Sequence, residues 1–443
     1  MHFVRSLKFI GAISNSRFQT RDMATRFRKE EHIMPQTTTT PRIAPTIIII
    51  AGCLISMITF GPRSSMGFFQ LPIISEFGWG RDTFGFAIAI QNLFWGMGQP
   101  FSGAVADRLG ISKVLIFGLL LHAAGLALMT VTSTPATFTI TSGVLFGLAL
   151  SGCSFNMVLA AFTKLLPLER RGMAFGLGTA CGSFGQFLFS PLSVGLIDGF
   201  GWRVTALVYA GLLILAVPLA LALRTPTAAS VAASQPAAPR ASIRETLAHA
   251  FAYRSYILLV LGFFTCGFHL AFITVHLPAY MRDGGLDPKI GGWVVASIGL
   301  FNIIGSLTAG YLVNLWPRRY LLAVIYALRS VAIIIFIALP VTPASAIFFG
   351  AFMGLLWLST VPPTSSLVAT MFGVKDMAML YGFVFFSHQV GGFLGVWIGG
   401  ILYEAQGNYN LVWYASIALG IASAIVNLPI KEQAAPARKL AAA

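Results

Sequence analysis

The chain has 443 residues, of which 10% are charged and 56% are hydrophobic, and it contains 37 phenylalanines. A soluble domain carries about 25% charged residues, so this composition excludes a soluble globular protein and also a disordered or collagen-like chain. Four cysteines are too few for a disulfide framework. The long unbroken apolar runs also exclude a β-barrel, whose strands are about 10 residues long and alternate in polarity. The composition therefore predicts an all-α membrane protein with many spans.

The formal net charge is +15. In a soluble protein this excess would suggest a nucleic-acid partner. Here the basic residues lie in the tails and in short loops between apolar runs, so we expect no nucleic-acid partner. We interpret these residues as topology signals beside a lipid bilayer.

A helix that crosses a bilayer needs about 20 predominantly apolar residues. Runs of this kind recur from residue 45 onward, and the sequence predicts twelve transmembrane helices at about 45–72, 83–106, 113–132, 136–166, 171–197, 202–223, 254–281, 289–314, 318–339, 342–372, 376–403 and 409–430.

A segment rich in Ala, Pro, Thr and Ser at 224–253 divides these helices into six and six. Its composition predicts a flexible cytoplasmic linker between an N-terminal bundle at 45–223 and a C-terminal bundle at 254–430. Residues 242–252, near the end of the linker, predict a short amphipathic helix at the membrane surface. A short C-terminal tail, 431–443, follows the last span.

Residues 1–44 form a basic N-terminal tail, and its first part, 1–33, is polar with one short apolar patch. The Arg-rich, acid-poor beginning is similar to a transit peptide. Alternatively, translation begins at Met34 and residues 1–33 are a mis-assigned start. We assign this segment no fold.

The distribution of cations predicts the orientation in the membrane. Of the 29 Lys and Arg residues, those in the predicted outer loops are Arg81, Arg203, Arg282 and Lys289, and those inside spans are Arg63 and Arg329. Positive charge stays on the cytoplasmic side. We therefore expect a multi-pass protein with both termini in the cytoplasm. We predict the bacterial inner membrane as its location.

The two halves of the chain resemble each other at an offset of about 207 residues. Gly103 to Asp107 aligns with Gly310 to Asn314, and at an offset of 206 Gly185 falls on Gly391. A constant offset across several spans indicates two six-helix pseudo-repeats. Parallel repeats of this kind are typical of transporters that hold a central site between their halves.

The segment Gly103-Ala-Val-Ala-Asp107-Arg108-Leu-Gly110-Ile-Ser-Lys113 resembles the loop 2–3 signature of the major facilitator superfamily. The resemblance implies the major facilitator fold and a cytoplasmic gate. Close helix approach at Gly103 and pairing of Asp107 across the interface between the halves would close this gate. The gating motif then comprises these residues and their degenerate second copy: Gly103, Asp107, Arg108, Gly110, Lys113, Gly310 and Asn314.

Within that superfamily, residues 45–430 resemble the bacterial monocarboxylate-transporter-like branch near the oxalate/formate antiporters. The resemblance rests on segments such as Gly61-Pro62-Arg63 in the first span, Phe77-Gly-Trp-Gly-Arg81 after it, and His276-Leu-Pro in the seventh. It implies a secondary transporter of a small organic anion, with a proton or in exchange. Where members often carry a cation in the eighth or eleventh span, this chain has none in the eighth and His388 in the eleventh.

Arg63 is the main candidate for an anion-binding residue. An arginine deep in a span is costly unless it faces a cavity or a partner. Gly61 and Pro62 should interrupt the helix just before it. A new half-helix beginning near Arg63 would then point its positive end into the pore, beside a guanidinium suited to a carboxylate. The alternative is that Arg63 extends to the outer headgroups.

Further polar residues in spans complete the candidate binding site: Asn156, Gln186, His269, His276, Arg329, His388 and Gln389. Arg329 either contacts the anion or bonds only to neighbouring carbonyls. Because no Asp or Glu lies deep in a span, a coupled proton would be carried by a histidine or by the substrate acid. His269 and His276, seven residues apart, share one helix face. The alternative for each histidine is a neutral residue that bonds between helices.

The sequence therefore predicts alternating-access transport of a small organic anion, a monocarboxylate in first place, with Arg63 as the anion site. Two alternatives remain: efflux of hydrophobic drugs through a Phe-rich cavity, and a non-transporting membrane sensor. A phosphate-binding loop, a catalytic triad and a metal-ligand pattern are all absent from the sequence. We expect no enzyme activity, no cofactor and no metal, and partners limited to the anion, lipid and protons, in a monomer.

Overall fold

The computed structural model describes residues 43–225 and 243–436, and within these ranges all regular structure is helical. Three of the predicted segments fall wholly or mostly outside them: the tail at 1–44, the central part of the linker and the end of the C-terminal tail.

The first half of the chain forms the first six spans. Their elements are α2 (Pro45–Ser64), α3 (Met66–Phe77), α4 (Arg81–Leu109), α5 (Ile111–Met129), α6 (Pro135–Phe138), η1 (Thr139–Leu145), α7 (Phe146–Cys153), α8 (Phe155–Leu165), α9 (Leu168–Ala216) and η2 (Val217–Leu223). Here α2 and α3 make the first span, and α6 to α8 make the fourth. The long α9 turns at Gly201, where φ is 79°, so it provides both the fifth and the sixth.

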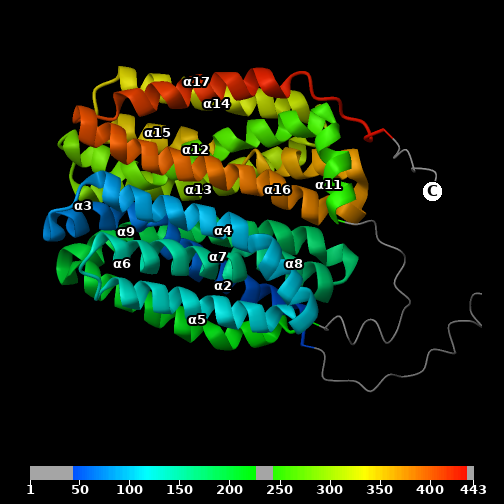
Figure 1. Ribbon diagram of the computed structural model, residues 1–443, viewed down its shortest axis with the longest axis horizontal. Helices are drawn as coiled ribbons and strands as arrows, with labels where there is room; N and C mark the ends of the chain where they lie inside the picture. Colours follow the sequence, from blue (N-terminus) through cyan, green and yellow to red (C-terminus); the bar gives the residue numbers. More distant parts are fainter. Residues whose placement is uncertain (1–42, 226–242, 437–443) are drawn as a thin grey trace, which may run out of the picture. The chain divides into compact units, whose positions relative to one another are not determined.

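The second half begins with the short helix α11 (Ile243–Ala252), in the segment where the sequence predicts a surface helix. Six spans follow, built from α12 (Arg254–Asp283), α13 (Pro288–Leu312), α14 (Arg318–Ala338), α15 (Pro343–Leu356), α16 (Val361–Gln406) and α17 (Asn410–Asn427). Figure 1 shows the two halves, with α2 to α9 in blue to green and α11 to α17 in green to red.

The described residues contain ten helical segments that are long and apolar enough to cross a membrane. One of them, Glu169–Leu223, has 55 residues and turns at Gly201, so it counts as two spans. The second span, α4, is long enough but less apolar than these ten segments, because it carries polar side chains, including Gln91 and Asn92. Together these helices make twelve spans, and the predicted all-α membrane fold is confirmed.

The repeat is visible in local structure. The fourth and tenth spans both begin with a threonine capping box followed by proline, at Thr134 and Thr342. Both spans are also interrupted midway, at Ser154 in the first half and over residues 357–360 in the second. Broken helices at matching positions are a feature of transporters that bind their substrate between two repeats.

The halves pack against each other through three pairs of helices: α4 with α16, α9 with α13, and α3 with α12 (Figure 1). Glycines allow close helix contacts within each half. A Cβ at Gly185 would lie 2.5 Å from the carbonyl oxygen of Met57, and one at Gly391 would lie 2.0 Å from that of Phe264. These repeat-related glycines therefore set the distance between helices.

The gating glycines differ. A Cβ at Gly103 or Gly310 would meet no atom of the described residues within 4 Å. The close approach expected at Gly103 is therefore not made in this conformation.

Replacing Gly391 by Ala should destabilise the protein by about 1–3 kcal/mol, because the methyl group would force α16 away from α12. The melting temperature of the purified protein in detergent measures this effect. Gly310→Ala is the matched control and should melt like the wild type, since its methyl group has free space. Equal melting temperatures for the two variants would contradict this packing.

Candidate functional site

A cavity of about 70 Å³ lies between the two halves. Its first-half wall contains Phe60, Arg63, Ser64, Asn92, Trp95, Phe155, Asn156 and Gln186. Its second-half wall contains Phe263, Leu270, Ala271, Thr274, Trp357, Leu358, Val361, Tyr381, Phe385, His388 and Gln389. Five of the eight predicted site residues therefore meet at one place: Arg63, Asn156, Gln186, His388 and Gln389.

Arg63 lies in the last turn of α2 and is only 6% exposed. Its Nη2 donates to Oδ1 of Asn92 at 2.8 Å, while its Nε is buried without a partner. The amide of Asn92 is itself held by a 3.0 Å bond from Nδ2 to the carbonyl of Ile88. Asn92 therefore presents its oxygen to the guanidinium and fixes the position of Arg63 on the cavity wall.

The helix interruption lies two residues beyond the predicted place. Pro62 weakens the helix as expected, but α2 continues to Ser64 and α3 begins only at Met66. The hydroxyls of Ser64 and Ser65 both donate to the carbonyl of Gly61, at 2.8 and 3.0 Å, and so satisfy part of the break.

This position corrects one prediction about the dipole. Arg63 lies at the C-terminal end of α2 and not at the start of a new half-helix. A cation is favoured at a helix C-terminus, where the dipole is negative, so α2 stabilises the charge of Arg63 without adding a second positive charge. Because Arg63 lines the cavity, the alternative that it extends to the outer headgroups does not hold here.

Within the described residues, the cavity carries a positive charge, that of Arg63, without a negative charge to balance it. No Asp or Glu lines it, and the ion pairs among the described residues do not include Arg63. A charge buried in the membrane interior with only an amide partner is costly. The site can therefore gain free energy by taking an anion, because a guanidinium matches the two oxygens of a carboxylate.

The second-half wall offers neutral polar groups. His388 Nδ1 and Gln389 Oε1 are 3.1 Å apart, and the Nε2 of Gln389 is buried without a partner. On the first-half side, Gln186 Nε2 donates to the carbonyl of Val295 at 3.4 Å, and Asn156 lies in the first turn of α8. Donors from both halves thus face one cavity.

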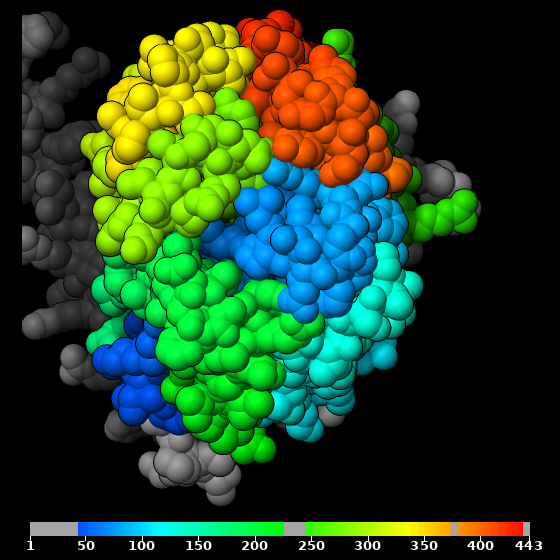
Figure 2. Space-filling model, turned by 90° about the vertical axis from the view of Figure 1, so that its left-hand side faces the viewer, coloured from blue at the N-terminus to red at the C-terminus, as the bar shows by residue number. Residues whose placement is uncertain are grey.

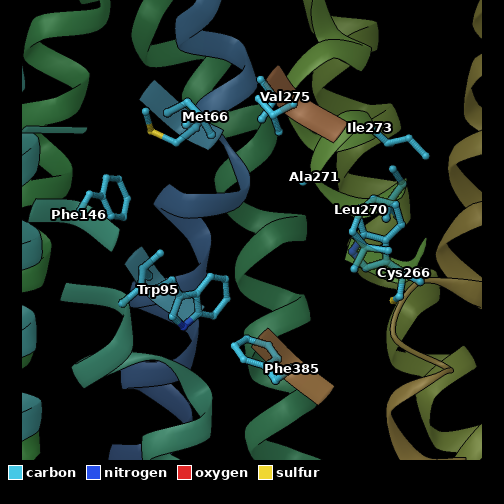
Figure 3. Close-up of a cluster of buried hydrophobic side chains, with 14 of the residues drawn as sticks. Met66, Trp95, Phe146, Cys266, Leu270, Ala271, Ile273, Val275 and Phe385 are labelled. Carbon is cyan, nitrogen blue, oxygen red and sulfur yellow. The ribbon is translucent and has the colours of Figure 1, made fainter. Parts of the chain in front are cut away.

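Aromatic rings make up much of the remaining cavity wall. Trp95 of α4 and Phe385 of α16 meet edge to face across the interface between the halves, with ring centroids 5.4 Å apart (Figure 3). Nothing in the sequence distinguishes these two rings among 37 phenylalanines and 8 tryptophans. The only sequence signal of Asn92 is an amide in an apolar run.

Arg329 has a different role from Arg63. It is fully buried on α14, outside the cavity lining. Its Nη2 donates to the carbonyl of Leu356 at 2.7 Å and also to that of Trp357, and its Nε donates to Leu356 at 3.2 Å. These carbonyls lie at the interruption of the tenth span, so Arg329 replaces the lost helical hydrogen bonds. Of the two predicted roles, the structure shows the bond to carbonyls.

His269 and His276 also lie outside the cavity lining. Nε2 of His269 bonds to the carbonyl of Ser416 at 2.8 Å, and Nε2 of His276 bonds to that of Val396 at 2.9 Å. Their shared face of α12 therefore packs against neighbouring helices. Both fit the alternative of a residue that bonds between helices.

The ion pair formed by the gating motif lies within the first half. Asp107 pairs with Lys164 at 2.5 Å, at the ends of α4 and α8, so the expected pairing across the interface is absent from the described residues. Gly110 has φ of 91° and links α4 to α5. Arg108, Lys113 and Asn314 are exposed.

The opposite face is closed. There Arg81, at the start of α4, forms an ion pair with Asp283 of α12 at 2.7 Å, and its N–H donates to Glu404 of α16. Figure 2 shows this face, where the blue segment of the first half lies against the orange segment of the second. An ion pair thus joins the two halves on the Arg81 face, whereas the described residues on the face of the gating motif form no ion pair across the interface.

Two six-helix repeats around a central cavity, joined by an ion pair on one face, are the architecture of a secondary transporter of the alternating-access type. The chain belongs to the Major Facilitator Superfamily, whose model matches residues 48–361 and 281–442. It is therefore a multi-pass membrane transporter and not an enzyme.

Relatives and solved structures agree with this assignment. The chain is 26% identical over 381 residues to the uncharacterized MFS-type transporter YcxA of Bacillus subtilis, covering 83% of this chain and 90% of the relative. It is 24% identical to monocarboxylate transporter 13 of Rattus norvegicus, covering 86% and 88%. A D-xylose-proton symporter structure superposes with a TM-score of 0.69 at 15% identity, covering 88% of this chain and 97% of that one, and shows the same fold.

The buried arginines Arg63 and Arg329 should respond differently to substitution. Arg329→Gln should lower the melting temperature, because each carbonyl left unpaired costs about 1–3 kcal/mol. Arg63→Gln should leave it unchanged or raise it, because the variant removes a buried cation that lacks a carboxylate partner. Thermal unfolding of both purified variants measures the difference. A lower melting temperature for Arg63→Gln than for Arg329→Gln would overturn the distinction between them.

Proposed function

We propose that this protein transports a small organic anion, a monocarboxylate in first place, by alternating access. The observation that carries the proposal is the buried guanidinium of Arg63, which faces a cavity without any carboxylate and keeps its Nε unpaired. A substrate carboxylate would supply the missing negative charge.

The cavity suits a substrate with one charged end and a small apolar body. The carboxylate would bind Arg63, which Asn92 holds in place at 2.8 Å. The apolar part would lie against Trp95 and Phe385, and the free Nε2 of Gln389 would donate from the other half. Contacts with both halves at once are what a transporter needs to couple binding to movement.

The size of the cavity also favours a small substrate. Its volume is about 70 Å³, whereas sites for drug-sized ligands measure about 300–1,000 Å³. The 24% identity to a monocarboxylate transporter of Rattus norvegicus supports the same substrate class. On the distribution of Lys and Arg, we further propose that both termini lie in the cytoplasm. The 26% identity to an MFS-type transporter of Bacillus subtilis supports a bacterial inner membrane, and we propose that the protein acts there as a monomer.

Efflux of hydrophobic drugs is the second candidate, and the aromatic lining of the cavity favours it. A cationic drug would, however, meet Arg63 with no acidic side chain on the cavity wall. Measuring the transport of small carboxylates and of cationic drugs therefore distinguishes the two candidate functions.

Proteoliposomes that contain the wild-type protein should take up a radiolabelled small monocarboxylate, and Arg63→Gln should abolish this uptake. Loss of one partner of a buried charge pair costs about 2–5 kcal/mol, which weakens binding at least about 30-fold. Arg63→Lys should keep part of the activity, since it retains the charge but not the planar fork.

Arg244→Gln is the matched control for this experiment. It removes the same charge from the exposed face of α11, away from the cavity, and should transport like the wild type. Wild-type carboxylate uptake by Arg63→Gln would refute the anion site. Uptake restricted to apolar cations would replace the proposal with drug transport.

A further inference from the structure

On the closed face, one residue of the first half is held by four residues of the second. Both Nη atoms of Arg81 donate to the Asp283 carboxylate at 2.7 Å. Nη1 also donates to the hydroxyl of Tyr409 at 3.0 Å, and the backbone N–H donates to Glu404. The guanidinium carbon lies 3.7 Å from the ring centre of Tyr403. We refer to these five residues as the latch.

The latch is the ion-paired connection between the two halves within the described parts of the chain. The other ion pairs found there each lie inside one half. Arg81 is 6% exposed, and two-pronged charge-assisted bonds of this kind are among the strongest in proteins. Opening this face therefore requires that the latch be weakened.

A buried histidine, His276, contacts the latch residue Tyr409. His276 Nδ1 lies 3.1 Å from the hydroxyl of Tyr409 and 3.4 Å from Nε2 of Gln70, which belongs to α3 in the first half. Its Nε2 lies 2.9 Å from the carbonyl oxygen of Val396. Because a carbonyl can only accept, Nε2 carries the hydrogen, and Nδ1 is the acceptor in a neutral ring.

These bonds fit together only when His276 is neutral. The Tyr409 hydroxyl can then donate to Nδ1 and accept from Arg81, and the amide of Gln70 can donate to the same nitrogen. All three contacts agree with the donor and acceptor roles of these groups.

A proton on Nδ1 reverses these roles. The N–H of the ring would point at the amide N–H of Gln70, and the oxygen of Tyr409 would have to accept from both His276 and Arg81. The hydroxyl hydrogen would lose its acceptor. The ring would also place a second positive charge beside the guanidinium.

Within the described parts of the chain, no free carboxylate lies beside the ring to compensate for that charge. Of the charged and titratable groups around the ring, Asp283 and Glu404 are engaged by Arg81. Asp82, next to Arg81, accepts from the backbone N–H of Thr83. The remaining groups are phenols: Tyr280 on α12, Tyr403 on α16, and Tyr409 before α17.

We propose that His276 is the site where a coupling proton binds, and that its protonation releases the latch. The proton comes from the aqueous phase on the Arg81 face and binds Nδ1. It favours the conformation in which the two halves separate on that face. This inference rests on the proposed transport function and names its coupling ion, but its test needs no substrate.

The experiment measures the distance between the halves on the Arg81 face by spin-label pair spectroscopy. Ser133 and Ala344 are exposed at the starts of the fourth and tenth spans, and each would be replaced by a labelled cysteine. The four native cysteines, which are all unpaired, would be replaced by alanine. Spectra of the reconstituted protein at about pH 5 and about pH 8 bracket the titration of histidine.

In the wild type, the long-distance population should grow several-fold at the lower pH. His276→Gln should keep the short distance at both values. Arg81→Gln should show the long distance at both, because the latch is gone. His269→Gln is the matched control: it changes a buried histidine on the same helix that also bonds to a carbonyl, and it should respond to pH like the wild type.

Tyr409→Phe provides an independent test that leaves the histidine intact. It removes the hydroxyl that connects His276 to Arg81, so the response to pH should be reduced. A wild-type distance that does not change with pH would overturn the proposal, and so would a full response in both His276→Gln and Tyr409→Phe. Failure here leaves anion uptake through Arg63 untouched, and failure of anion uptake leaves the latch result untouched.

Discussion

Three arginines are buried in the described part of this transporter, and their partners assign them three different roles. Arg329 is surrounded by backbone carbonyls and repairs a broken helix. Arg81 holds a carboxylate of the opposite half and closes one face. Arg63 has only the amide of Asn92, so its charge stays uncompensated at the centre of the protein. A buried cation without a counter-ion is costly, and an anion bound in the cavity would remove that cost.

The position of the latch relative to the cavity explains how one binding event can move two helical bundles. Arg81 and Arg63 both belong to the first half, and most of the groups that face them across the interface come from α12 and α16. A ligand that binds both walls of the cavity, and a proton that weakens the latch, would each bias the same separation of the halves. At the end of the molecule that carries the gating motif, Gly103 and Gly310 have no atom of the described residues within 4 Å of an added Cβ, which leaves room for the halves to approach there.

Apolar runs and a constant offset were enough to predict twelve spans in two repeats. The length of a span is visible as a continuous apolar run, and the repeat is visible as matching residues at one offset. The Gly61-Pro62 pair likewise predicted a weak point in the first span, but the helix breaks at Ser65, where two serine hydroxyls bond to the carbonyl of Gly61. The face that a helix turns to the cavity depends on neighbours far away in the chain. His276, which was predicted to line the substrate site, therefore bonds to Tyr409 outside it. The bond from Arg81 to Asp283 joins residues 202 positions apart, so no local pattern in the sequence could predict it.

The most direct test of the central claim is the binding of a matched pair of ligands, a small monocarboxylic acid and its neutral amide, to the purified protein. The two have the same shape and differ by the charge that Arg63 is proposed to bind. Stabilisation against heat measures binding to the folded state. We predict that the carboxylate stabilises the wild type, that the amide does not, and that Arg63→Gln loses this preference. Equal stabilisation of the wild type by both ligands would contradict it.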